Sequence, residues 1–570
     1  MAREHFDAVV VGSGFGGSVC AYRLAGAGLR VCLLERGRPY PPGSFPRTQH
    51  ALSESFWDPS EDHYGMFNVW SFKGIEALVA SGLGGGSLIY ANVLLRKPPE
   101  WFVEREAYAG AEERWPVTYD DLVPHYERAE AMLGAQRFPF EHAPYSEAKK
   151  TQALKTAAER LGLEWTLPNL AVTFAADGRP PATGEPIPEA QPNYHAATNG
   201  RSYTRTTCRL CGECDVGCNY GSKNTLDYNY LTAAHHAGAD IRPLSEVLAF
   251  APRSEGGYAV RYVRHDPDGG YWKRAGREPV EVTADRLVLG AGTLGSTFLL
   301  LKNRGALPNL SGRLGAGFCG NGDLLSFAVK CTEPVDGEVG QAQTRDLGPT
   351  YGPVITSTVR VPDTLDGGDG RGFYVQDAGY PAFATWLVEA TNVRGTVRRL
   401  VRVAGRRVYA MLSRDPNADI GAEVAAVLGD CALSRSSLPL LGMGRDVPDG
   451  ALYLEGEDHL ACTWSIESSK PFFGRVRDTM EAITEAWGGE FVPNPTYRIS
   501  RVITVHPLGG CPMGSSPEHG VVDAHGEAFG HPGLYVAVGA VMPGPVGPNP
   551  ALTIAALADR TADRILDQRG

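Results

Sequence analysis

Short apolar runs separated by glycine-rich turns mark the beginning of the chain. Residues 6–11 are mostly apolar and β-branched, which is typical of a strand buried on both faces. Residues 18–27 repeat their apolar positions with helical spacing and stop at Gly28, and the apolar run at 29–34 ends in Glu35. This order predicts a strand, a helix and a second strand that form one parallel βαβ unit.

The same alternation returns in the second half of the chain. A strand, glycine turn and helix start are predicted at 286–296, and a strand at 533–540 precedes a helix that reaches Asp563. Alternating apolar and polar positions at 354–361 and 459–467 instead predict antiparallel strands. The pattern therefore predicts an α/β plus α+β protein, with a Rossmann-like domain and a discontinuous domain built on an antiparallel sheet.

Length and charge narrow the class of protein. A chain of 570 residues is long enough for two closely joined domains. Its net charge of −11 argues against nucleic-acid binding, because phosphate contacts require a basic face. We find neither an apolar run of about 18 residues nor room for a signal peptide before the first strand, so we expect a cytoplasmic protein. Its 11 cysteines are then expected as thiols or metal ligands.

A glycine fingerprint, residues 12–17 (Gly-Ser-Gly-Phe-Gly-Gly), separates the first predicted strand from its helix. With an acid after the second strand, this spacing predicts a dinucleotide site. Gly12 allows the tight turn, Gly14 lets the backbone approach the pyrophosphate, and Gly17 lets helix and strand pack. The helix N-terminus faces the phosphates, and Glu35 accepts hydrogen bonds from ribose hydroxyls. The predicted cofactor contacts in this part of the chain are Gly12, Gly14, Phe15, Gly16, Gly17 and Glu35.

A second glycine-rich segment, residues 80–92, distinguishes FAD from NAD. Its three consecutive glycines at 84–86 allow the chain to lie flat against a large planar group, with Ser87 and Asn92 as hydrogen-bonding ends. Together with residues 12–17, this segment resembles the flavin-binding segments of the GMC (glucose-methanol-choline) family of flavoenzymes. The resemblance implies FAD, with further contacts from Gly85, Gly86, Ser87, Asn92, Val247, Gly539 and Ala540.

We expect the FAD to be bound non-covalently. Residues 60–100 contain a single candidate for a histidyl linkage, His63, and it lies well before the glycine loop. The family resemblance also implies a division of the chain. The FAD-binding domain would comprise 1–97, 201–324 with the cysteine-rich segment, and 499–570, and the substrate domain with its lid would comprise 98–200 and 325–498.

Two polar residues near the C-terminus are held in stiff turns. His506 lies between the apolar run 502–505 and Pro507-Leu508-Gly509-Gly510, and Asn549 lies in Gly547-Pro548-Asn549-Pro550. A buried histidine is more often only a hydrogen-bonding core residue. The surrounding blocks, however, resemble the C-terminal part of GMC enzymes, which place a His with a His or an Asn over the flavin. The resemblance implies that His506 is the base and that Asn549 orients the substrate.

Four cysteines lie close together in residues 208–218, with C-x₂-C-x₂-C-x₃-C spacing. The spacing is that of bacterial ferredoxins without the proline that follows there, which indicates a [4Fe-4S] or [3Fe-4S] cluster. Zinc and free thiols or disulfides are the alternatives. Some GMC dehydrogenases carry a cluster in an equivalent insertion, and Cys208, Cys214 and Cys218 match their ligand spacing. The predicted metal ligands are Cys208, Cys211, Cys214 and Cys218.

The leading hypothesis for function is FAD-dependent oxidation of an alcohol by hydride transfer to flavin N5, with His506 as base. Resemblance to the cholesterol-oxidase-like branch implies a hydrophobic secondary alcohol such as a sterol 3β-hydroxyl. The electron acceptor would be O₂ or, in a cluster-containing dehydrogenase, a carrier protein. A non-redox flavin enzyme is the third alternative. Basic residues 394–414 predict a solvated helix face or a peripheral membrane contact, and proline-rich residues 178–192 an exposed loop or lid.

Overall fold

The computed structural model describes residues 4–568 with internal gaps. The basic stretch 394–414 lies outside the described residues, so its predicted role stays a prediction. The gaps are residue 177 and residues 268–277, 336–339, 383–384 and 386–431.

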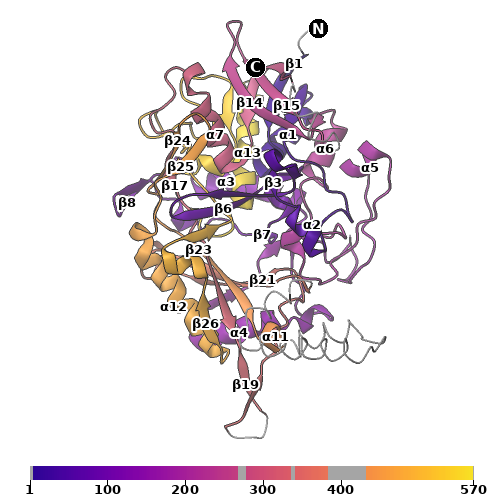
Figure 1. The fold of residues 1–570 in the computed structure, drawn as a ribbon, viewed down its shortest axis with the longest axis vertical. Coiled ribbons are helices and arrows are strands. Elements are labelled where there is room, and N and C mark those ends of the chain that lie inside the picture. The colour runs from indigo at the N-terminus through magenta and orange to yellow at the C-terminus, as the bar shows by residue number, and fades with distance from the viewer. Residues whose placement is uncertain are drawn as a thin grey trace, which may run out of the picture.

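A mixed sheet forms the upper half of the molecule in Figure 1. Its strands β13, β2, β1, β16 and β28 are parallel, because the βαβ connections return each strand in the same direction, while β14 and β15 add an antiparallel ribbon. The first half of β16 pairs with β15, and its second half pairs with β28. The bounds are β1 Glu4–Val11, β2 Val31–Leu34, β13 Asp240–Arg242, β14 Ser245–Pro252, β15 Tyr258–Arg264, β16 Val280–Leu289 and β28 Leu534–Val536.

Helices cover this mixed sheet and bury its apolar strands. The strand β1 alternates little and is almost entirely buried from Ala8 onward, as expected for a central parallel strand. Helix α1 packs against both α13 and α6, and α13 also packs against α3. The bounds of these helices are α1 Phe15–Gly26, α3 Tyr119–Met132, α6 Tyr230–His236, α7 Gly292–Lys302 and α13 Ala551–Asp567.

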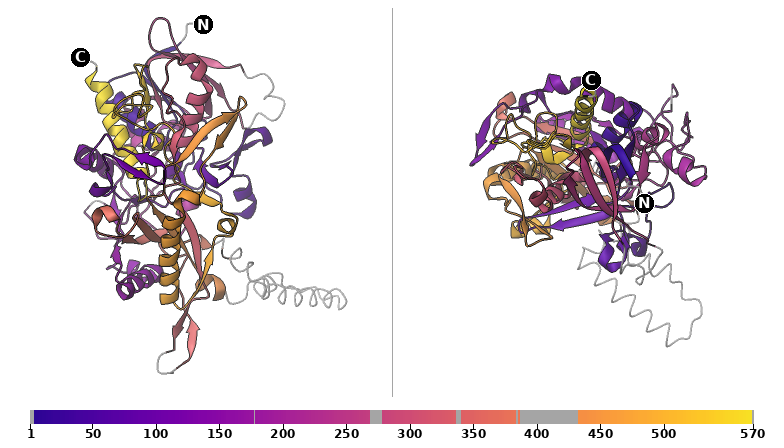
Figure 2. Two further views of the ribbon diagram at one scale, coloured as in Figure 1. Left: turned by 90° about the vertical axis from the view of Figure 1, so that its left-hand side faces the viewer. Right: turned by 90° about the horizontal axis from the view of Figure 1, so that it is seen from above.

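An antiparallel sheet forms the lower half, in the order β11-β21-β22-β23-β18-β26 for the described strands. Helices α4 and α12 pack against it, and Figure 2 shows α12 running along this half of the molecule. The bounds are β11 Glu164–Thr166, β18 Leu324–Val329, β21 Ile355–Val361, β22 Phe373–Ala378, β23 Leu438–Gly444, β26 Glu490–Pro493, α4 Lys149–Leu161 and α12 Lys470–Ala486.

Small sheets join the two halves. The N- and C-termini lie at one end of the molecule, and the hairpin of β19 and β20 projects from the other (Figures 1 and 2). The bounds of the joining strands are β5 Phe67–Ser71, β6 Ile75–Ala80, β27 Val502–Thr504, β17 Ala316–Phe318, β24 Gly450–Glu455, β25 His459–Cys462, β7 Val93–Leu94, β10 Gln136–Arg137 and β12 Asn169–Leu170. Those of the projecting hairpin are β19 Thr332–Pro334 and β20 Ala342–Thr344. The remaining short elements are β3 Trp57–Asp58, β4 His63–Tyr64, β8 Glu106–Tyr108, β9 Ala111–Glu113, α2 Gln49–Ser53, α5 Tyr194–Asn199 and α11 Ala432–Arg435.

Most predicted elements are confirmed, with three corrections. Helix α1 begins at Phe15, three residues before the predicted start, because the fingerprint itself supplies its first turn. The predicted strand at 459–467 ends at Cys462, and a 3₁₀ turn begins at Glu467. The strand belongs to the sheet of β17, β24 and β25. The loop 178–192 is irregular as predicted, but its backbone hydrogen-bonds residues 205–207 just before the cysteine run.

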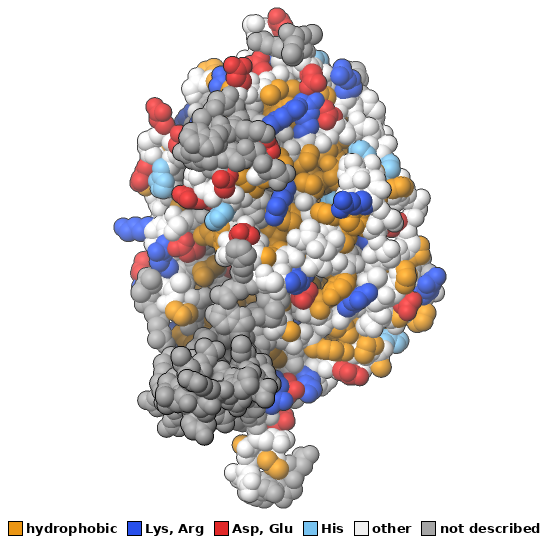
Figure 3. Space-filling model, turned by 45° about the vertical axis from the view of Figure 1, so that its right-hand side comes forward, with side chains coloured by type: hydrophobic (Ala, Val, Ile, Leu, Met, Phe, Trp, Pro, Cys, Tyr) orange, Lys and Arg blue, Asp and Glu red, His pale blue; other side chains and the backbone are white. Residues whose placement is uncertain are grey.

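Charges of both signs are interspersed on the face drawn in Figure 3, with hydrophobic side chains between them. None of the helices within the described residues is long and apolar enough to span a membrane.

Candidate active site

The two glycine-rich segments predicted to bind the cofactor lie against each other. A Cβ atom on Gly16 would lie 1.4 Å from the carbonyl oxygen of Ala537, and one on Gly85 would lie 2.6 Å from the Cα of Gly14. Phe15 packs edge-on against Tyr90, with ring centroids 5.3 Å apart. Close backbone packing therefore explains why glycine is required at positions 16 and 85.

Gly14 and Gly86 are different, because nothing in the protein fills the space beside them. A Cβ atom on Gly14 would meet no described atom closer than the oxygen of Gly290 at 4.0 Å, and one on Gly86 would meet nothing within 4 Å. Neither glycine has a positive φ. The fold therefore does not require glycine at these positions, whereas a ligand that approaches the backbone closely would.

Asn92 supplies a second indication that the site accepts a ligand. Its side chain is fully buried, yet both its amide oxygen and its amide nitrogen lack a partner among the described residues. A buried unpaired amide is costly, so such a group usually faces a ligand or water. Ser87, by contrast, already donates to the oxygen of Gly84 and accepts from the amide of Leu226, and therefore shapes the loop itself.

Glu35 joins the two segments at the end of β2. Its carboxylate accepts from the amide and hydroxyl of Ser13, at 2.9 and 2.7 Å, and from the amide of Gly37. The hydroxyl of Ser13 in turn accepts from the amide of Gly84. Burial raises the pKa of Glu35, and these hydrogen bonds oppose that shift. The carboxylate is thus held beside the fingerprint, where the ribose contact is predicted.

The other predicted contacts lie on the edges of this region. Val247 is buried in β14, whose first residue, Ser245, donates its amide to the oxygen of Glu35. The carbonyl oxygens of Gly539 and Ala540 accept from the amides of Gly509 and Cys511, just after His506. The fold therefore connects the cofactor segments with the turn that carries the predicted base.

His506 is oriented by a carboxylate that sequence analysis missed. Its Nδ1 lies 2.8 Å from an oxygen of Asp323, which is 1% exposed. The second oxygen of Asp323 accepts from the hydroxyl of Thr504 and from the amides of Val505 and His506. With Nδ1–H donating to the carboxylate, Nε2 carries the lone pair, and none of the described residues occupies it.

The loop 319–323, between β17 and β18, also holds the turn of Asn549. Asn321, which has φ 53°, accepts from the amide of Gly547 and donates to the oxygens of Gly547 and Pro548. One five-residue loop therefore binds both C-terminal turns, through Asn321 at its centre and Asp323 at its end. The turns of His506 and Asn549 thus bond to the same loop, although no local motif in the sequence points to that loop.

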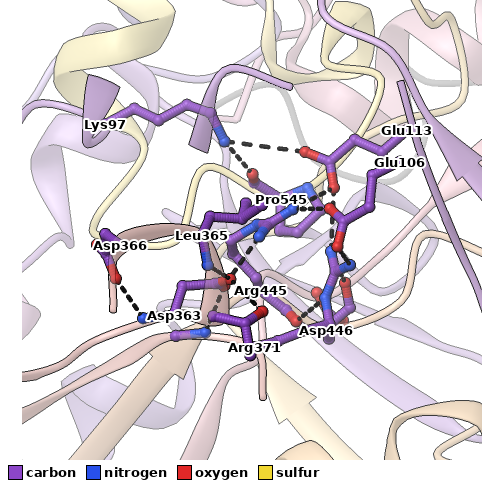
Figure 4. A network of polar contacts seen from close by, with 12 residues as sticks. Lys97, Glu106, Glu113, Asp363, Leu365, Asp366, Arg371, Arg445, Asp446 and Pro545 are labelled. Atoms are coloured by element: carbon purple, nitrogen blue, oxygen red, sulfur yellow. Dashed lines mark hydrogen bonds and ion pairs between the residues drawn. The ribbon is translucent and has the colours of Figure 1, made fainter. Parts of the chain in front are cut away.

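A buried ion-pair network lies next to this loop (Figure 4). The guanidinium of Arg445, fully buried, donates to Asp363 at 2.8 Å and to Glu113 at 3.2 Å, and also pairs with Glu106. Arg371 binds the same two glutamates. Each carboxylate therefore faces at least one cation. We define the ion-pair network as Lys97, Glu106, Glu113, Asp363, Arg371 and Arg445.

The network lies next to the segment that precedes Asn549 and, through the neighbouring Asp446, next to the loop 319–323. Lys97 donates to the oxygen of Pro545, four residues before Asn549. Asp446, next to Arg445, accepts from the amide of Gly320 in the loop 319–323. Burial lowers the pKa of Lys97 to about 7 and raises the pKa of Asp446 to about 7. Burial would also raise the pKa of Glu113, but Arg445, Lys97 and Arg371 lower it to about 2.

All four cysteines of residues 208–218 line one small cavity beside Lys223 and Gly352. Burial raises the pKa values of Cys208, Cys211 and Cys214, that of Cys211 to about 12. No three of these thiols lie within 4.8 Å of one another in the part of the chain that the structure describes. A tetrahedral zinc site with bonds of about 2.3 Å needs sulfur atoms about 3.8 Å apart, so the arrangement does not fit zinc.

Lys223 links this cavity to the second glycine-rich segment. Its buried ammonium donates to the oxygens of Leu88 and Tyr90, at 3.1 and 2.7 Å, and to that of Cys214 at 2.9 Å. Burial lowers the pKa of Lys223 to about 8. All ten cysteines within the described ranges are free thiols, so the disulfide alternative is not seen there.

A second cluster of side chains that could bind a metal comprises His125, Asp559 and Asp563. Its polar groups already have partners within the protein. Arg23 and Arg128 each pair with both carboxylates, and His125 hydrogen-bonds Asp559. Two guanidinium groups neutralise two carboxylates here. The cluster therefore fixes α1 and α3 against α13 and needs no metal ion.

The sheet order and the fingerprint geometry define an FAD-dependent oxidoreductase. A family model described as "FAD dependent oxidoreductase" matches residues 7–182, and one described as "GMC oxidoreductase" matches residues 475–558. A cholesterol oxidase of Mycobacterium tuberculosis is 32% identical over 98% of this chain and 91% of its own length. A cholesterol oxidase of Acinetobacter baumannii is 27% identical over 98% and 94%.

A formate oxidase of Aspergillus oryzae has the same fold, with a TM-score of 0.60 and 14% identity over 100% of this chain and 99% of that one. The chain belongs to the GMC oxidoreductase family and is an FAD-dependent alcohol oxidase or dehydrogenase.

Proposed function

We propose that the protein oxidises a hydrophobic secondary alcohol, such as a sterol 3β-hydroxyl, with His506 as the base. The cholesterol oxidases that resemble it along nearly the whole chain support this substrate class. One observation carries the assignment of residues. The loop 319–323 binds the turns of both His506 and Asn549, and its Asp323 leaves Nε2 of His506 available.

The reaction requires removal of a hydroxyl proton and of a carbinol hydride. Nε2 of His506 accepts the proton, and Asp323 stabilises the imidazolium that results. Asn549 holds the substrate oxygen and so orients the carbinol C–H bond, which is a positioning contribution to the rate. When bound, FAD supplies the acceptor for the hydride.

The residues that would hold FAD are those with unfilled space or unpaired polar atoms. Gly14 and Gly86 leave room for close backbone approach, and Asn92 offers both ends of its amide. Glu35 is already hydrogen-bonded to Ser13 and Gly37, and its carboxylate would accept the ribose hydroxyls in addition. The other predicted contacts shape the surrounding surface. They are Gly12, Phe15, Gly16, Gly17, Gly85, Ser87, Val247, Gly539 and Ala540. We expect acid or heat to release free FAD, and flavin that stays with the precipitate would show a covalent link.

Anaerobic flavin reduction tests the roles of the two residues. His506→Ala is expected to lower the rate of flavin reduction by about 10²-fold or more, the scale of general-base loss. Asn549→Ala should impair the same step while FAD stays bound. His519→Ala is the matched control, because His519 is exposed in the same C-terminal region. Wild-type reduction rates in either active-site variant would remove that residue from the mechanism.

A substrate panel tests the alcohol class. Cholesterol, a long-chain primary alcohol and a polyol are mixed with the oxidised enzyme without oxygen, and bleaching of the flavin is recorded. The sterol is expected to bleach it fastest, and hydrogen peroxide under air would identify O₂ as the acceptor. A preference for the polyol would contradict the proposed substrate class. If no alcohol bleaches the flavin, the non-redox alternative gains.

A second candidate, supported by the cysteine cavity, is a dehydrogenase that passes electrons singly to a carrier protein. The thiols of Cys208, Cys211, Cys214 and Cys218 line one cavity but lie farther apart than a zinc ion allows, and an iron–sulfur cluster separates its thiolates more widely than one ion does. Lys223, which is buried beside the cavity, would offset part of the charge of an anionic cluster. Bound there, a cluster would supply a one-electron acceptor next to the flavin segment.

Iron and sulfide assays on anaerobically purified protein decide this second candidate. It predicts near-stoichiometric iron and visible absorbance beyond that of flavin. Cys214→Ser should lose both while FAD remains, whereas Cys462→Ser, a buried thiol elsewhere, should keep them. Iron far below stoichiometric would mean that the segment is a cluster of neutral thiols. The oxidase would then remain as the proposed function.

A further inference from the structure

Asn549 is hydrogen-bonded to one side chain of the antiparallel sheet. Nε2 of Gln376 donates to the amide oxygen of Asn549 at 2.8 Å, and the amide nitrogen of Asn549 lies 3.5 Å from Oε1 of Gln376. Gln376 is fully buried in the middle of β22, and Asn549 is 6% exposed. The two primary amides thus face each other in a two-point contact.

We propose that Gln376 is a positioning residue that fixes the plane of the Asn549 amide for catalysis. The terminal torsion of asparagine is broad, so a free amide would turn through many orientations. Two contacts to a side chain anchored in a central strand remove that freedom before the substrate arrives. This inference rests on the proposed role of Asn549.

The surroundings of Gln376 support a dedicated pairing. A buried glutamine is costly unless its amide is satisfied, and Asn549 is its partner in the described structure. The residues opposite it on the neighbouring strands are Thr358 and Leu441, which do not ionise. The adjacent Asp377 faces elsewhere, where Thr356 and Ser357 bind its carboxylate.

Gln376 therefore has the same relation to Asn549 as Asp323 has to His506. Each reactive side chain comes from a C-terminal turn, and each orienting side chain comes from the antiparallel sheet or the loop that enters it at β18. The substrate-side half of the molecule then sets the geometry of groups carried by the other half.

A double-mutant cycle distinguishes positioning from a structural role. Gln376→Met has a similar length but removes both contacts, and it is expected to lower the limiting rate of anaerobic flavin reduction roughly tenfold. In an Asn549→Ala background the same change should cost nothing further, because Gln376 acts only through Asn549. Thr358→Val, directly opposite on β21, is the matched control and should stay within about twofold.

Gln376→Glu gives an independent test through pH. A carboxylate can only accept, so it repels the Asn549 oxygen and turns the amide. A protonated carboxyl offers one donor and one acceptor, which restores the two-point contact. The ratio of the Glu rate to the Met rate should therefore rise as pH falls. The ratio is used because it cancels any pH dependence of the reaction that the two variants share.

The outcomes separate this inference from the proposed function. Wild-type rates in Asn549→Ala would remove Asn549 from the mechanism and the inference with it. An impaired Asn549→Ala with an unaffected Gln376→Met, or with an equal loss in both backgrounds, would overturn only the inference, as would a pH-independent ratio. Flavin content is measured for each variant, and the two side chains differ enough that a folding failure of one leaves the other to decide.

Discussion

The ion-pair network and the cysteine cavity both bury ionisable side chains, but they are completed in different ways. In the network, the carboxylates of Glu113 and Asp363 meet guanidinium groups at hydrogen-bond distance. In the cavity, one buried and three half-buried thiols line the same space, and Lys223 donates to carbonyl oxygens of the adjacent glycine-rich segment. That segment ends in Asn92, whose buried amide has no partner among the described residues.

The difference indicates where the protein acts on its own and where it needs a ligand. Because its charged groups are paired with one another, the network can hold the neighbouring segments in place whether or not cofactor is bound. Unpaired buried groups gain free energy only when something else supplies their partner. Disruption of the network should therefore lower the free energy of unfolding, whereas substitution of Asn92 should chiefly weaken ligand binding.

The largest effect is expected for Arg445→Met. Removing this guanidinium leaves Glu113 and Asp363 buried without their main counter-charge, which should cost about 3–5 kcal/mol of unfolding free energy. Chemical denaturation measures it. Arg477→Met is the matched control, because Arg477 and Asp478 form an exposed pair worth at most about 1 kcal/mol. Equal losses in the two variants would show that the network is no more stabilising than a surface pair.

Asp323→Asn should leave stability nearly intact but lower the rate of flavin reduction by about 10²-fold. The asparagine oxygen can still accept backbone amides, but its NH₂ facing Nδ1 favours the tautomer with Nε2 protonated, and that tautomer cannot accept a proton. Asp523→Asn is the control, because Asp523 also accepts backbone amides outside the site. A rate within a few-fold of wild type would mean that Asp323 only holds the loop.

Asn92→Gly should weaken FAD binding about tenfold, the effect of one or two lost hydrogen bonds, without destabilising the protein that lacks FAD. Glycine is the appropriate substitute because Asn92 has φ 70°. Asn309→Gly, at φ 67° on the exposed surface, controls for the backbone change. Flavin fluorescence measures the dissociation constant, and thermal unfolding measures the FAD-free protein. Unchanged FAD affinity would place Asn92 outside the cofactor site.

The parts of this molecule that sequence alone could predict are local. The strand, glycine turn and helix units recur because one short pattern specifies each of them, and so residues 6–35 and 286–296 are recognisable. His506 and Asn549 could be proposed because proline and glycine fix the turns around them and the resemblance extends to those turns.

The orienting residues could not be predicted in this way. Asp323 meets His506 across 183 residues, and Gln376 meets Asn549 across 173. Those contacts depend on how β18 and β22 lie in a sheet whose order does not follow the sequence. A polar pair such as Asn321 and Asp323 beside glycines, just before an apolar strand, is the one signal that could have drawn attention to the loop.

The effect of Asp446→Asn on stability should depend on pH. Burial raises the pKa of Asp446 to about 7 in the folded protein, above the ordinary value near 4. The folded state therefore binds this proton more tightly, and the associated stability is present below about pH 4 and is lost as pH rises through 7.

Asparagine stays neutral and can still accept from Gly320. The variant should match wild type near pH 4 and exceed its unfolding free energy at pH 8, because it does not lose the stability that Asp446 loses on ionising. Urea unfolding at both pH values measures this, with the exposed Asp478→Asn as control. A variant that is less stable than wild type at pH 8 would mean that Asp446 is ionised and paired with Arg371, as a further member of the ion-pair network.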